Sequence, residues 1–319
     1  MTKKKDSILI LGADGFLGSN LALSLAKEER FNLRAFDLFK NGLSNNLESI
    51  RNDIKLIQGN FLNKEDLKTS LNGIDYVFHF ISLTTPSSSS DDPFIEIDTN
   101  IRSTLELLDE CVKAGIKRII FASTGGAIYG DQAKSIYSER DVTNPISPYA
   151  ISKLAIEKYL EYYRIRHGLS YLILRYSNPY GPHQNLVGSQ GIIPIFLNQI
   201  FEGRPVTIFG DGENIRDYIF VDDIIDITKK IFKKKTEHNL YNIGNGKGIT
   251  INMLLDAMRD ITGKKIKIKW QPKREIDIRK IVLDTKRIKM EMGDFKLTSL
   301  GEGIKKTWEW ISQQKSLKR

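Results

Sequence analysis

Residues 12–18 of this chain read Gly-Ala-Asp-Gly-Phe-Leu-Gly, between an apolar run at residues 7–11 and a helical pattern at residues 16–29. Glycine is favoured where a chain turns tightly and where the backbone must come close to a phosphate. The first amide groups of the following helix would face such phosphates with the positive end of the helix dipole. Because the spacing stands between a predicted strand and a predicted helix, it indicates a dinucleotide-binding turn rather than an ordinary glycine turn. The contacts expected from this turn are Gly12, Gly15, Phe16, Leu17 and Gly18.

The pattern around this stretch continues through the first half of the chain as alternating apolar runs and helical patterns. Continuous apolar runs are typical of parallel strands that are covered on both faces. The alternation therefore predicts an α/β fold, a doubly wound parallel sheet of the Rossmann type. Strands are predicted at residues 7–11, 33–37, 54–59, 75–81, 118–123 and 171–175, and helices at residues 16–29, 64–71, 94–114 and 149–166.

The alternation loosens from about residue 177, where short strands mix with helices. Residues 299–302, Ser-Leu-Gly-Glu, form a capping box at the start of the last predicted helix. We expect a dinucleotide-binding domain over residues 1–176 and a smaller α/β substrate-binding lobe over residues 177–319, some segments of which return to the first domain. Strands of this lobe are predicted at residues 206–209, 239–243 and 266–270, and helices at residues 191–202, 223–232, 251–261 and 299–314.

The composition is that of a globular protein, with 319 residues, 40% hydrophobic and 27% charged. The one cysteine, Cys111, excludes a disulfide framework within the chain and argues against a metal site. No apolar run approaches the ~18 residues that a membrane-spanning helix needs. The apolar stretch behind the basic N-terminus is too short for a secretory signal. We therefore expect a cytoplasmic protein without membrane insertion.

The chain is basic, with 48 lysines and arginines against 39 acidic residues, a net charge of +9. Such a balance can attract nucleic acids or other anions. No nucleic-acid motif and no basic patch interleaved with aromatic residues accompanies the charge. We interpret the lysines as solvated surface, and we expect no nucleic-acid partner.

Asp37 ends the second predicted strand, after Leu33-Arg34-Ala35-Phe36. A carboxylate at this place can bind both ribose hydroxyls of NAD and would repel the 2′-phosphate of NADP. The nearest following cation is Lys40. The residue therefore predicts NAD as the cofactor, although an aspartate at a strand end can also serve only to cap a turn.

Tyr149 and Lys153 form a Tyr-x-x-x-Lys pair on a predicted helix, and four-residue spacing puts both side chains on one face. A phenol is a poor base at neutral pH, and a neighbouring ammonium favours the phenolate and lowers the pKa. The fifth predicted strand runs into Ser123 and Thr124 at the carboxyl edge of the sheet, where ligands bind in such folds. The end of this strand therefore places a hydroxyl at the edge of the sheet where we expect the tyrosine.

Together these motifs resemble the extended short-chain dehydrogenases/reductases, and within them the NAD-dependent nucleotide-sugar epimerases and dehydratases, above all the UDP-glucose 4-epimerase group. The later segments are similar to the family's pattern in the same order. They are Leu-Arg-Tyr-Ser-Asn-Pro-Tyr-Gly-Pro at 174–182, Phe-Gly-Asp-Gly at 209–212, Arg-Asp-Tyr-Ile-Phe-Val-Asp-Asp at 216–223 and Arg-Glu-Ile-Asp at 274–277.

The resemblance implies a role for residues that match the family's motifs. The implied catalytic residues are Tyr149, Lys153, Thr124 and Ser123. Further contacts to NAD are implied for Asn60, Phe61, Ile81, Tyr149, Lys153 and Tyr176, and contacts to a nucleotide sugar for Thr124, Asn178, Phe209, Arg216, Arg274 and Asp277. The resemblance also implies a homodimer in which residues 94–114 and 149–166 pair into a four-helix interface.

Departures from the family's pattern narrow the reaction. Enzymes similar to the 4,6-dehydratases carry acidic residues after the threonine, where this chain has Gly125-Gly126, and Ala127 stands where a GDP-fucose type enzyme has cysteine. The remaining outcome is a 4-epimerase that acts on a UDP-hexose through a 4-keto sugar. An NDP-4-keto-6-deoxy-sugar reductase and a non-catalytic NAD-binding regulator remain alternatives.

The sequence also gives predictions for three further positions. Asn60 replaces the family's usual aspartate, and His79 is expected to be a packed strand residue rather than a catalytic one. Ile281 stands where the resemblance places the wall of the hexose pocket, which favours UDP-glucose and UDP-galactose over the N-acetyl sugars.

Overall fold

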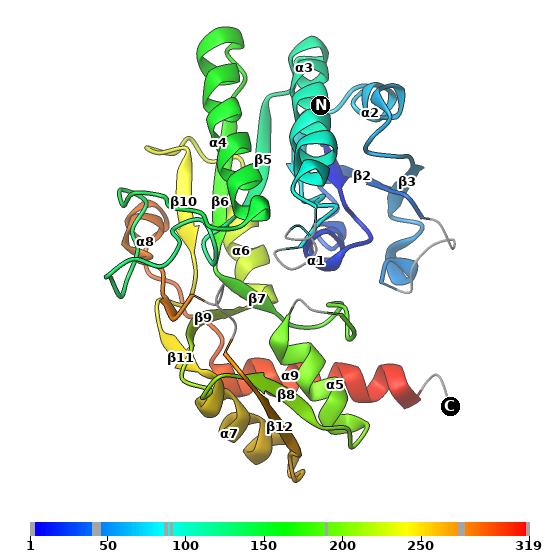
Figure 1. Ribbon diagram of the computed structural model, residues 1–319. Helices are drawn as coiled ribbons and strands as arrows, with labels where there is room; N and C mark the ends of the chain where they lie inside the picture. The colour runs from blue at the N-terminus through cyan, green and yellow to red at the C-terminus, as the bar shows by residue number, and fades with distance from the viewer. Residues whose placement is uncertain are drawn as a thin grey trace. The chain divides into compact units, whose positions relative to one another are not determined.

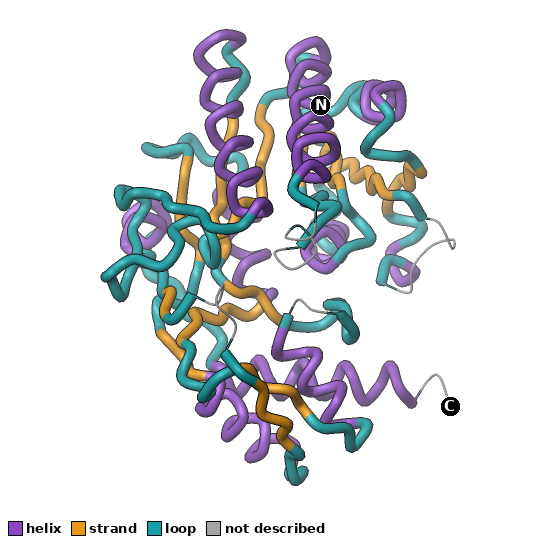
Figure 2. The backbone as a smooth tube through the Cα atoms, in the orientation of Figure 1, coloured by secondary structure: helices purple, strands orange, loops and turns teal. Residues whose placement is uncertain are grey.

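A computed structural model describes residues 4–39, 46–85, 89, 92–188, 191–273 and 278–316. The chain divides into two compact units, each made of several segments. The first unit comprises Met1–Ser123, Ser147–Leu174 and Ile227–Leu240, and the second comprises Thr124–Ile146, Arg175–Asp226 and Tyr241–Arg319. Figure 1 traces the elements of both units along the chain, and Figure 2 separates helices from strands.

Seven strands form one sheet in the order β10-β6-β5-β4-β1-β2-β3. The strand β1 pairs in parallel with β2 on one side and with β4 on the other, so the winding direction reverses at β1. In such sheets the crevice at the reversal, beyond the carboxyl ends of the strands, is where ligands bind. The strands are β1 (Asp6–Leu11), β2 (Phe31–Asp37), β3 (Ile54–Gln58), β4 (Tyr76–His79), β5 (Arg118–Thr124), β6 (Tyr171–Tyr176) and β10 (Leu240–Ile243).

The helices between these strands cover buried strand faces. Apolar side chains from β1, β4, β5 and β6 pack with those of α3 and α4 in a single core that includes Leu9, Val77 and Ile119. The helices are α1 (Phe16–Ala26), α2 (Lys64–Ser70), a π-helical turn at Glu96–Ile101, α3 (Arg102–Ala114) and α4 (Pro148–His167), with a short 3₁₀ turn at Glu48–Ile50. The helices α3 and α4 run side by side (Figure 1), and the Tyr163 hydroxyl of α4 donates to Asp109 Oδ1 of α3 at 2.6 Å.

The second unit has a core of its own. Apolar residues of α5, α7 and α9 pack around β8 and β9, with Leu197, Ile208 and Leu254 at the centre. The strands are β7 (Asn178–Tyr180), β8 (Val206–Phe209), β9 (Ile215–Phe220), β11 (Gly248–Thr250), β12 (Ile268–Gln271) and β13 (Lys280–Ile281). The helices are α5 (Ile192–Phe201), α6 (Val221–Ile231), α7 (Ile251–Thr262), α8 (Lys286–Met292) and α9 (Leu300–Ser316).

The predicted fold class is confirmed, and most predicted elements begin and end within a few residues of the observed ones. The capping box of α9 is present, since the Glu302 amide donates to Ser299 Oγ and the Ser299 amide donates to Glu302 Oε2. One predicted helix is different: residues 96–101 form a π-helical turn before α3. Within the described residues, no helix has the length and apolarity needed to cross a membrane.

Candidate active site

The glycine turn after β1 is built as a close backbone contact. Gly12 has a φ of +83°, and its amide donates to the Phe36 carbonyl of β2 at 3.0 Å. A Cβ on Gly18 would lie 2.0 Å from the Gly12 carbonyl oxygen, so only glycine lets α1 start this near to β1. Gly15 caps α1 without a side-chain hydrogen bond. The first amide groups of the helix are therefore not covered by a capping side chain, the arrangement that suits a pyrophosphate.

Asp37 joins this turn to the end of β2. Its Oδ2 accepts from the Asp14 amide at 3.0 Å, and its Oδ1 accepts from the Leu38 amide at 2.8 Å. Each carboxylate oxygen can accept more than one hydrogen bond, so ribose hydroxyls could be bound as well. The structure shows that the residue caps the turn, and it leaves the ribose contact as a prediction.

The remaining cofactor candidates of the first unit lie at the same edge of the sheet. A Cβ on Gly12 would lie 3.0 Å from the Ile81 amide nitrogen, so Ile81 borders the glycine turn. Asn60 is exposed, and its Oδ1 accepts from the Leu62 amide. Phe61 is buried against His79, with ring centroids 5.2 Å apart. Tyr176 is buried at the end of β6 and belongs to the second unit.

His79 is a packed strand residue, as expected. It is buried, its Nε2 lies 2.9 Å from Thr104 Oγ1, and its ring contacts Phe61 and Phe121. Burial, with the nearby charge of Lys153, lowers the pKa of His79 to about 3. The imidazole is therefore neutral at physiological pH.

The helix α4 positions the Tyr-x-x-x-Lys pair. Ser147 caps the helix by accepting from the Ala150 amide at 3.3 Å, and Pro148 occupies the first turn, where its missing amide is not needed. Lys153 is buried, and its Nζ donates to the Ala122 carbonyl of β5 at 3.1 Å. The same nitrogen lies 5.7 Å from the centre of the Tyr149 ring. The spacing therefore places both side chains on one face at the end of β5.

The pKa of Tyr149 is shifted in the direction opposite to the one expected from the sequence. Desolvation by the surrounding protein, with the charge of Glu96, raises the pKa of Tyr149 rather than lowering it. Desolvation lowers the pKa of Lys153 to about 8, while the charges of Glu96 and Glu157 oppose that change. The expected lowering by Lys153 considered only the local spacing, and the burial of both groups outweighs it.

The two candidate hydroxyls have different partners. Ser123 is buried and donates to Glu157 Oε1 of α4 at 2.5 Å. Thr124 follows at the end of β5, and its hydroxyl has no hydrogen-bond partner among the described residues. The bond to Glu157 engages the Ser123 proton, which leaves Thr124 as the better candidate for a donor to substrate.

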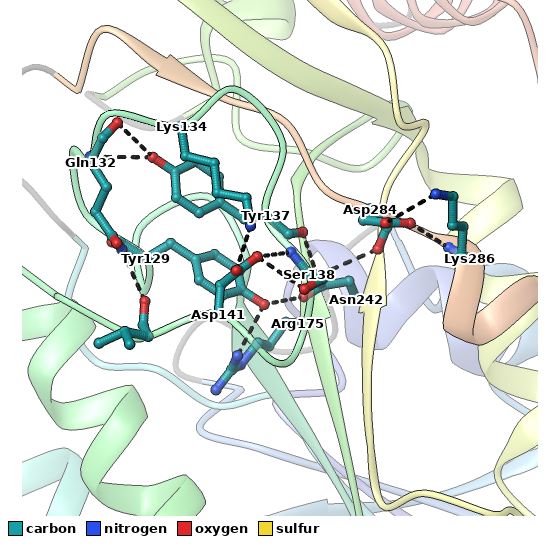
Figure 3. Close-up of polar contacts among 11 residues, drawn as sticks. Tyr129, Gln132, Lys134, Tyr137, Ser138, Asp141, Arg175, Asn242, Asp284 and Lys286 are labelled. Carbon is teal, nitrogen blue, oxygen red and sulfur yellow. Dashed lines mark hydrogen bonds and ion pairs between the residues drawn. The ribbon is translucent and has the colours of Figure 1, made fainter.

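The segment after Thr124 is held by a buried network, shown in Figure 3. The Tyr129 ring stacks on Tyr137 with centroids 5.2 Å apart, and its hydroxyl donates to Asn242 Oδ1 at 2.7 Å. Arg175 Nη1 donates to the same hydroxyl at 3.0 Å, and burial raises the pKa of Tyr129 to about 12. The Ile-Tyr-Gly motif is therefore an anchor, and Tyr129 takes no part in proton transfer at neutral pH.

Gly125 and Gly126 lie in different surroundings. A Cβ on Gly125 would lie 2.4 Å from Leu283 Cδ1 and 3.1 Å from the Arg175 carbonyl oxygen. A Cβ on Gly126 would make only ordinary contact, 3.4 Å from Asn178 Oδ1. Packing therefore requires the first glycine, while the second faces a candidate substrate residue.

The substrate candidates of the second unit gather on two neighbouring strands. Asn178 Nδ2 on β7 donates to the Asp217 carbonyl of β9 at 3.0 Å, and Arg216 precedes Asp217 on that strand. The buried Asp217 carboxylate accepts from the amides of Asn245, Gly246 and Leu283. Phe209 ends β8, which pairs with β12. Arg274 and Asp277 lie outside the described residues.

Ile281 lies in β13, beside Arg216 of β9 in parallel register, and the residue is 1% exposed. Its place at the wall of a hexose pocket stays a prediction.

Sequence reasoning missed two buried carboxylates beside the pair, Glu96 and Glu157. Glu157 follows Lys153 by one helical turn, a spacing that could have been noticed. Glu96 reaches α4 from the π-helical turn, through the hydroxyl of Ser152. No local pattern marks that contact.

Comparison with known proteins shows the family to which the chain belongs. The family model described as "NAD dependent epimerase/dehydratase family" matches residues 8–244. A putative UDP-glucose 4-epimerase of Methanocaldococcus jannaschii is 32% identical over 95% of this chain and 98% of its own. A dTDP-4-dehydro-6-deoxyglucose reductase of Escherichia coli is 30% identical over 96% of this chain and 98% of its own.

A solved structure is similar over nearly the whole chain. The UDP-glucose 4-epimerase of Thermotoga maritima, determined with UDP-glucose, superposes with a TM-score of 0.90 at 36% identity, covering 97% of this chain and 99% of that one. The family match covers the glycine turn, the Tyr149–Lys153 pair and the strands that position them. The chain is thus a member of the NAD-dependent epimerase/dehydratase family, and its cofactor is NAD.

Proposed function

We propose that the protein is a nucleotide-sugar 4-epimerase that interconverts UDP-glucose and UDP-galactose, or the corresponding N-acetyl pair. One observation carries the proposal: the Tyr149–Lys153 pair is complete, while the segment that follows β5 has Gly125 and Gly126, which offer no acid or base. A dehydratase must also remove a proton from C5 and expel the C6 hydroxyl, which needs such side chains. The names of the relatives in Methanocaldococcus and Thermotoga support a 4-epimerase.

The chain's own residues would hold the cofactor and move one proton. The glycine turn would bind the pyrophosphate, and Asp37 would bind the adenosine ribose. NAD, when bound, supplies the acceptor and then the donor of the hydride at C4. Tyr149 takes the proton of the 4′-hydroxyl as a phenolate and returns it after the sugar has turned over, while the Lys153 ammonium favours the phenolate. Thr124 donates a hydrogen bond to the same oxygen.

The nucleotide part of the substrate would bind to the second unit. Asn178 would contact the phosphates, and Phe209 would lie near the base. Arg216 and Arg274 would clamp the diphosphate, because two guanidinium groups suit two phosphates, and Asp277 would hold the nucleoside ribose.

A second candidate is an NDP-4-keto-sugar reductase. The Escherichia coli relative, named a dTDP-4-dehydro-6-deoxyglucose reductase, favours it. Such an enzyme uses the same tyrosine and lysine but exchanges its cofactor on every turnover. Asp37 argues against the usual NADPH, since its carboxylate would repel a 2′-phosphate.

A two-part assay separates these functions. Purified protein is incubated with UDP-galactose and no added cofactor, and separately with NADPH and a dTDP-4-keto-6-deoxy sugar. The epimerase forms UDP-glucose in the first mixture and consumes no NADPH in the second. Consumption of NADPH without interconversion would support the reductase. Inactivity in both mixtures, and also with UDP-N-acetylgalactosamine in the first, would support a non-catalytic NAD-binding regulator.

A further inference from the structure

Glu96 is a buried carboxylate that the proposed mechanism does not use. It lies in the π-helical turn before α3, and the residue is 2% exposed. Three side chains donate to it: Ser152 Oγ at 2.6 Å, Asn100 Nδ2 at 2.9 Å, and the Thr84 hydroxyl. A carboxylate that only accepts hydrogen bonds is stabilised in its ionised form. Buried charges are costly unless they are bonded in this way, and the three donors supply such bonds.

Glu96 is bonded to the same turn of α4 that carries the catalytic pair. Ser152, its donor on α4, stands between Tyr149 and Lys153 in the sequence, and Ser152 Oγ also lies 2.8 Å from the Tyr149 carbonyl oxygen. The charge of Glu96 raises the pKa of both Tyr149 and Lys153. One carboxylate therefore acts on the acid and on the base of the same proton-transfer step.

Glu157 and His79 are further titratable side chains near the pair. On α4, Glu157 accepts from Ser123 and also raises the pKa of Lys153. On β4, His79 is neutral because burial lowers its pKa to about 3. Glu96 is therefore the carboxylate whose charge raises the pKa of Tyr149, while Glu157 raises the pKa of Lys153 alone.

We propose that Glu96 is a positioning residue for the catalytic pair, whose fixed charge keeps Lys153 an ammonium and sets the pH range in which Tyr149 exchanges its proton. The proposal rests on the proposed function in taking Tyr149 and Lys153 as that pair. It explains why a buried glutamate is held by three donors, while the lysine donates, among the described residues, to the Ala122 carbonyl.

The loss of the Glu96 charge moves the pH profile of kcat in one direction, whichever of the two groups forms each limb of the profile. Removing a negative charge favours the phenolate of Tyr149 and the neutral amine of Lys153, so both titrations move to lower pH. A bell-shaped profile of kcat, whichever group forms which limb, then moves as a whole to lower pH. The expected displacement is about one pH unit, the size of shift that one charge a few ångströms away produces.

The test compares Glu96→Gln with two controls, all as NAD-loaded protein. Ser152→Ala removes one donor and leaves the charge, and Glu96→Asp keeps the charge on a shorter side chain. We expect the kcat profile of Glu96→Gln to move acidward by about one unit, while both controls stay within about 0.3 unit of the unmutated protein. Glu96→Ala repeats the measurement if the glutamine variant does not fold.

A second readout does not depend on turnover. Tyrosinate absorbance is titrated for each variant against the same variant carrying Tyr149→Phe, and the difference reports the ionisation of Tyr149 alone. An acidward shift in this titration without any epimerase activity would support the role of Glu96 and reject the proposed function. An unmoved or alkaline titration in Glu96→Gln would overturn the role of Glu96, whatever the enzyme's activity.

Discussion

At the scale of single residues, the proposed mechanism depends first on the ionisation of Tyr149. Its phenol is disfavoured as a phenolate by desolvation and by Glu96, so it is a strong base once it has lost its proton. In the proposed mechanism Lys153 offsets part of this cost, and its own pKa of about 8 leaves it mostly charged at neutral pH. The two side chains therefore depend on each other, and a change in either has a distinct effect.

Replacing Tyr149 by phenylalanine should lower kcat by about 10²–10⁴-fold, the usual contribution of a general acid–base group. Binding of UDP-sugar should remain within about threefold, because the ring and not the hydroxyl fills space. Kinetics together with calorimetric binding would check both numbers. A variant that keeps a third or more of the normal rate would remove Tyr149 from the reaction.

The Lys153→Arg variant tests whether a positive charge at this position is sufficient for activity. The planar guanidinium keeps the charge but cannot place one compact donor at the Ala122 carbonyl. We expect Lys153→Ala and Lys153→Arg to be impaired by similar factors, measured as kcat. Near-normal activity of the arginine variant would show that geometry at Lys153 matters little.

Asp37 should determine the choice between NAD and NADP. In Asp37→Asn the shape and one acceptor remain while the charge is lost, and in Asp37→Ala the bonds to the amides of Asp14 and Leu38 are lost too. We expect weaker NAD binding in both variants, by about 1.5–3 kcal/mol for each charge-assisted hydrogen bond lost, and stronger NADP binding relative to NAD. Titration of cofactor-free protein with each nucleotide measures this. Equal affinity of the unmutated protein for both would contradict the ribose assignment.

Sequence reasoning located residues that act through local geometry. The glycine turn, Asp37 and the Tyr149–Lys153 spacing are all contained in one turn or one strand end, so their arrangement follows from the chain itself. Glu96 could not be found in this way, because its contact with Ser152 joins positions 56 residues apart. The pairing of Ile281 with β9 likewise joins residues far apart in the sequence.

At the scale of elements, the strands of the seven-stranded sheet were predictable because continuous apolar runs of five or six residues are rare outside buried strands. The short strands β7, β9, β11 and β13 were not predicted. The strands β13 and β11 have only two and three residues, too few to show an alternation of apolar and polar residues. The strand β9 contains the charged residues Arg216 and Asp217. Their pairing depends on the folded second unit rather than on local propensity.

The two glycines after β5 give a prediction for that segment. Gly125→Ala should unfold at a lower temperature, because its Cβ would overlap Leu283 and press on the Arg175 carbonyl; overpacking of this kind costs about 1–3 kcal/mol. Gly126→Ala should keep its melting temperature and lose kcat, if the sugar turns over against this position. Thermal melts and kinetics of the pair decide it, and equal kcat in Gly126→Ala and unmutated protein would place the rotating sugar elsewhere.

At the scale of the whole molecule, apolar side chains remain exposed on the helices expected to form a dimer. On α4, Ile151, Tyr162 and Ile165 follow one face and are 52%, 54% and 70% exposed, and before α3 Phe94 is 70% exposed. Such a face is typical of a self-complementary interface in a twofold dimer.

We therefore predict that the protein is a dimer in solution and that Ile151→Glu with Tyr162→Glu yields monomers. Light scattering after size-exclusion chromatography measures the mass of each. Met290 is exposed on α8, and the variant Met290→Lys serves as a control that should remain dimeric. A monomeric unmutated protein would contradict the interface.

The most direct test of the account follows the hydrogen at C4 of the sugar. UDP-galactose carrying deuterium at C4 is incubated with the purified protein and no added nicotinamide, and the product is examined by NMR and mass spectrometry. The account predicts UDP-glucose with the deuterium retained at C4, and none formed by Tyr149→Phe. Deuterium lost to the solvent would show that a proton rather than a hydride leaves C4, and the absence of UDP-glucose or its N-acetyl counterpart from the matching substrate would contradict the proposed 4-epimerase.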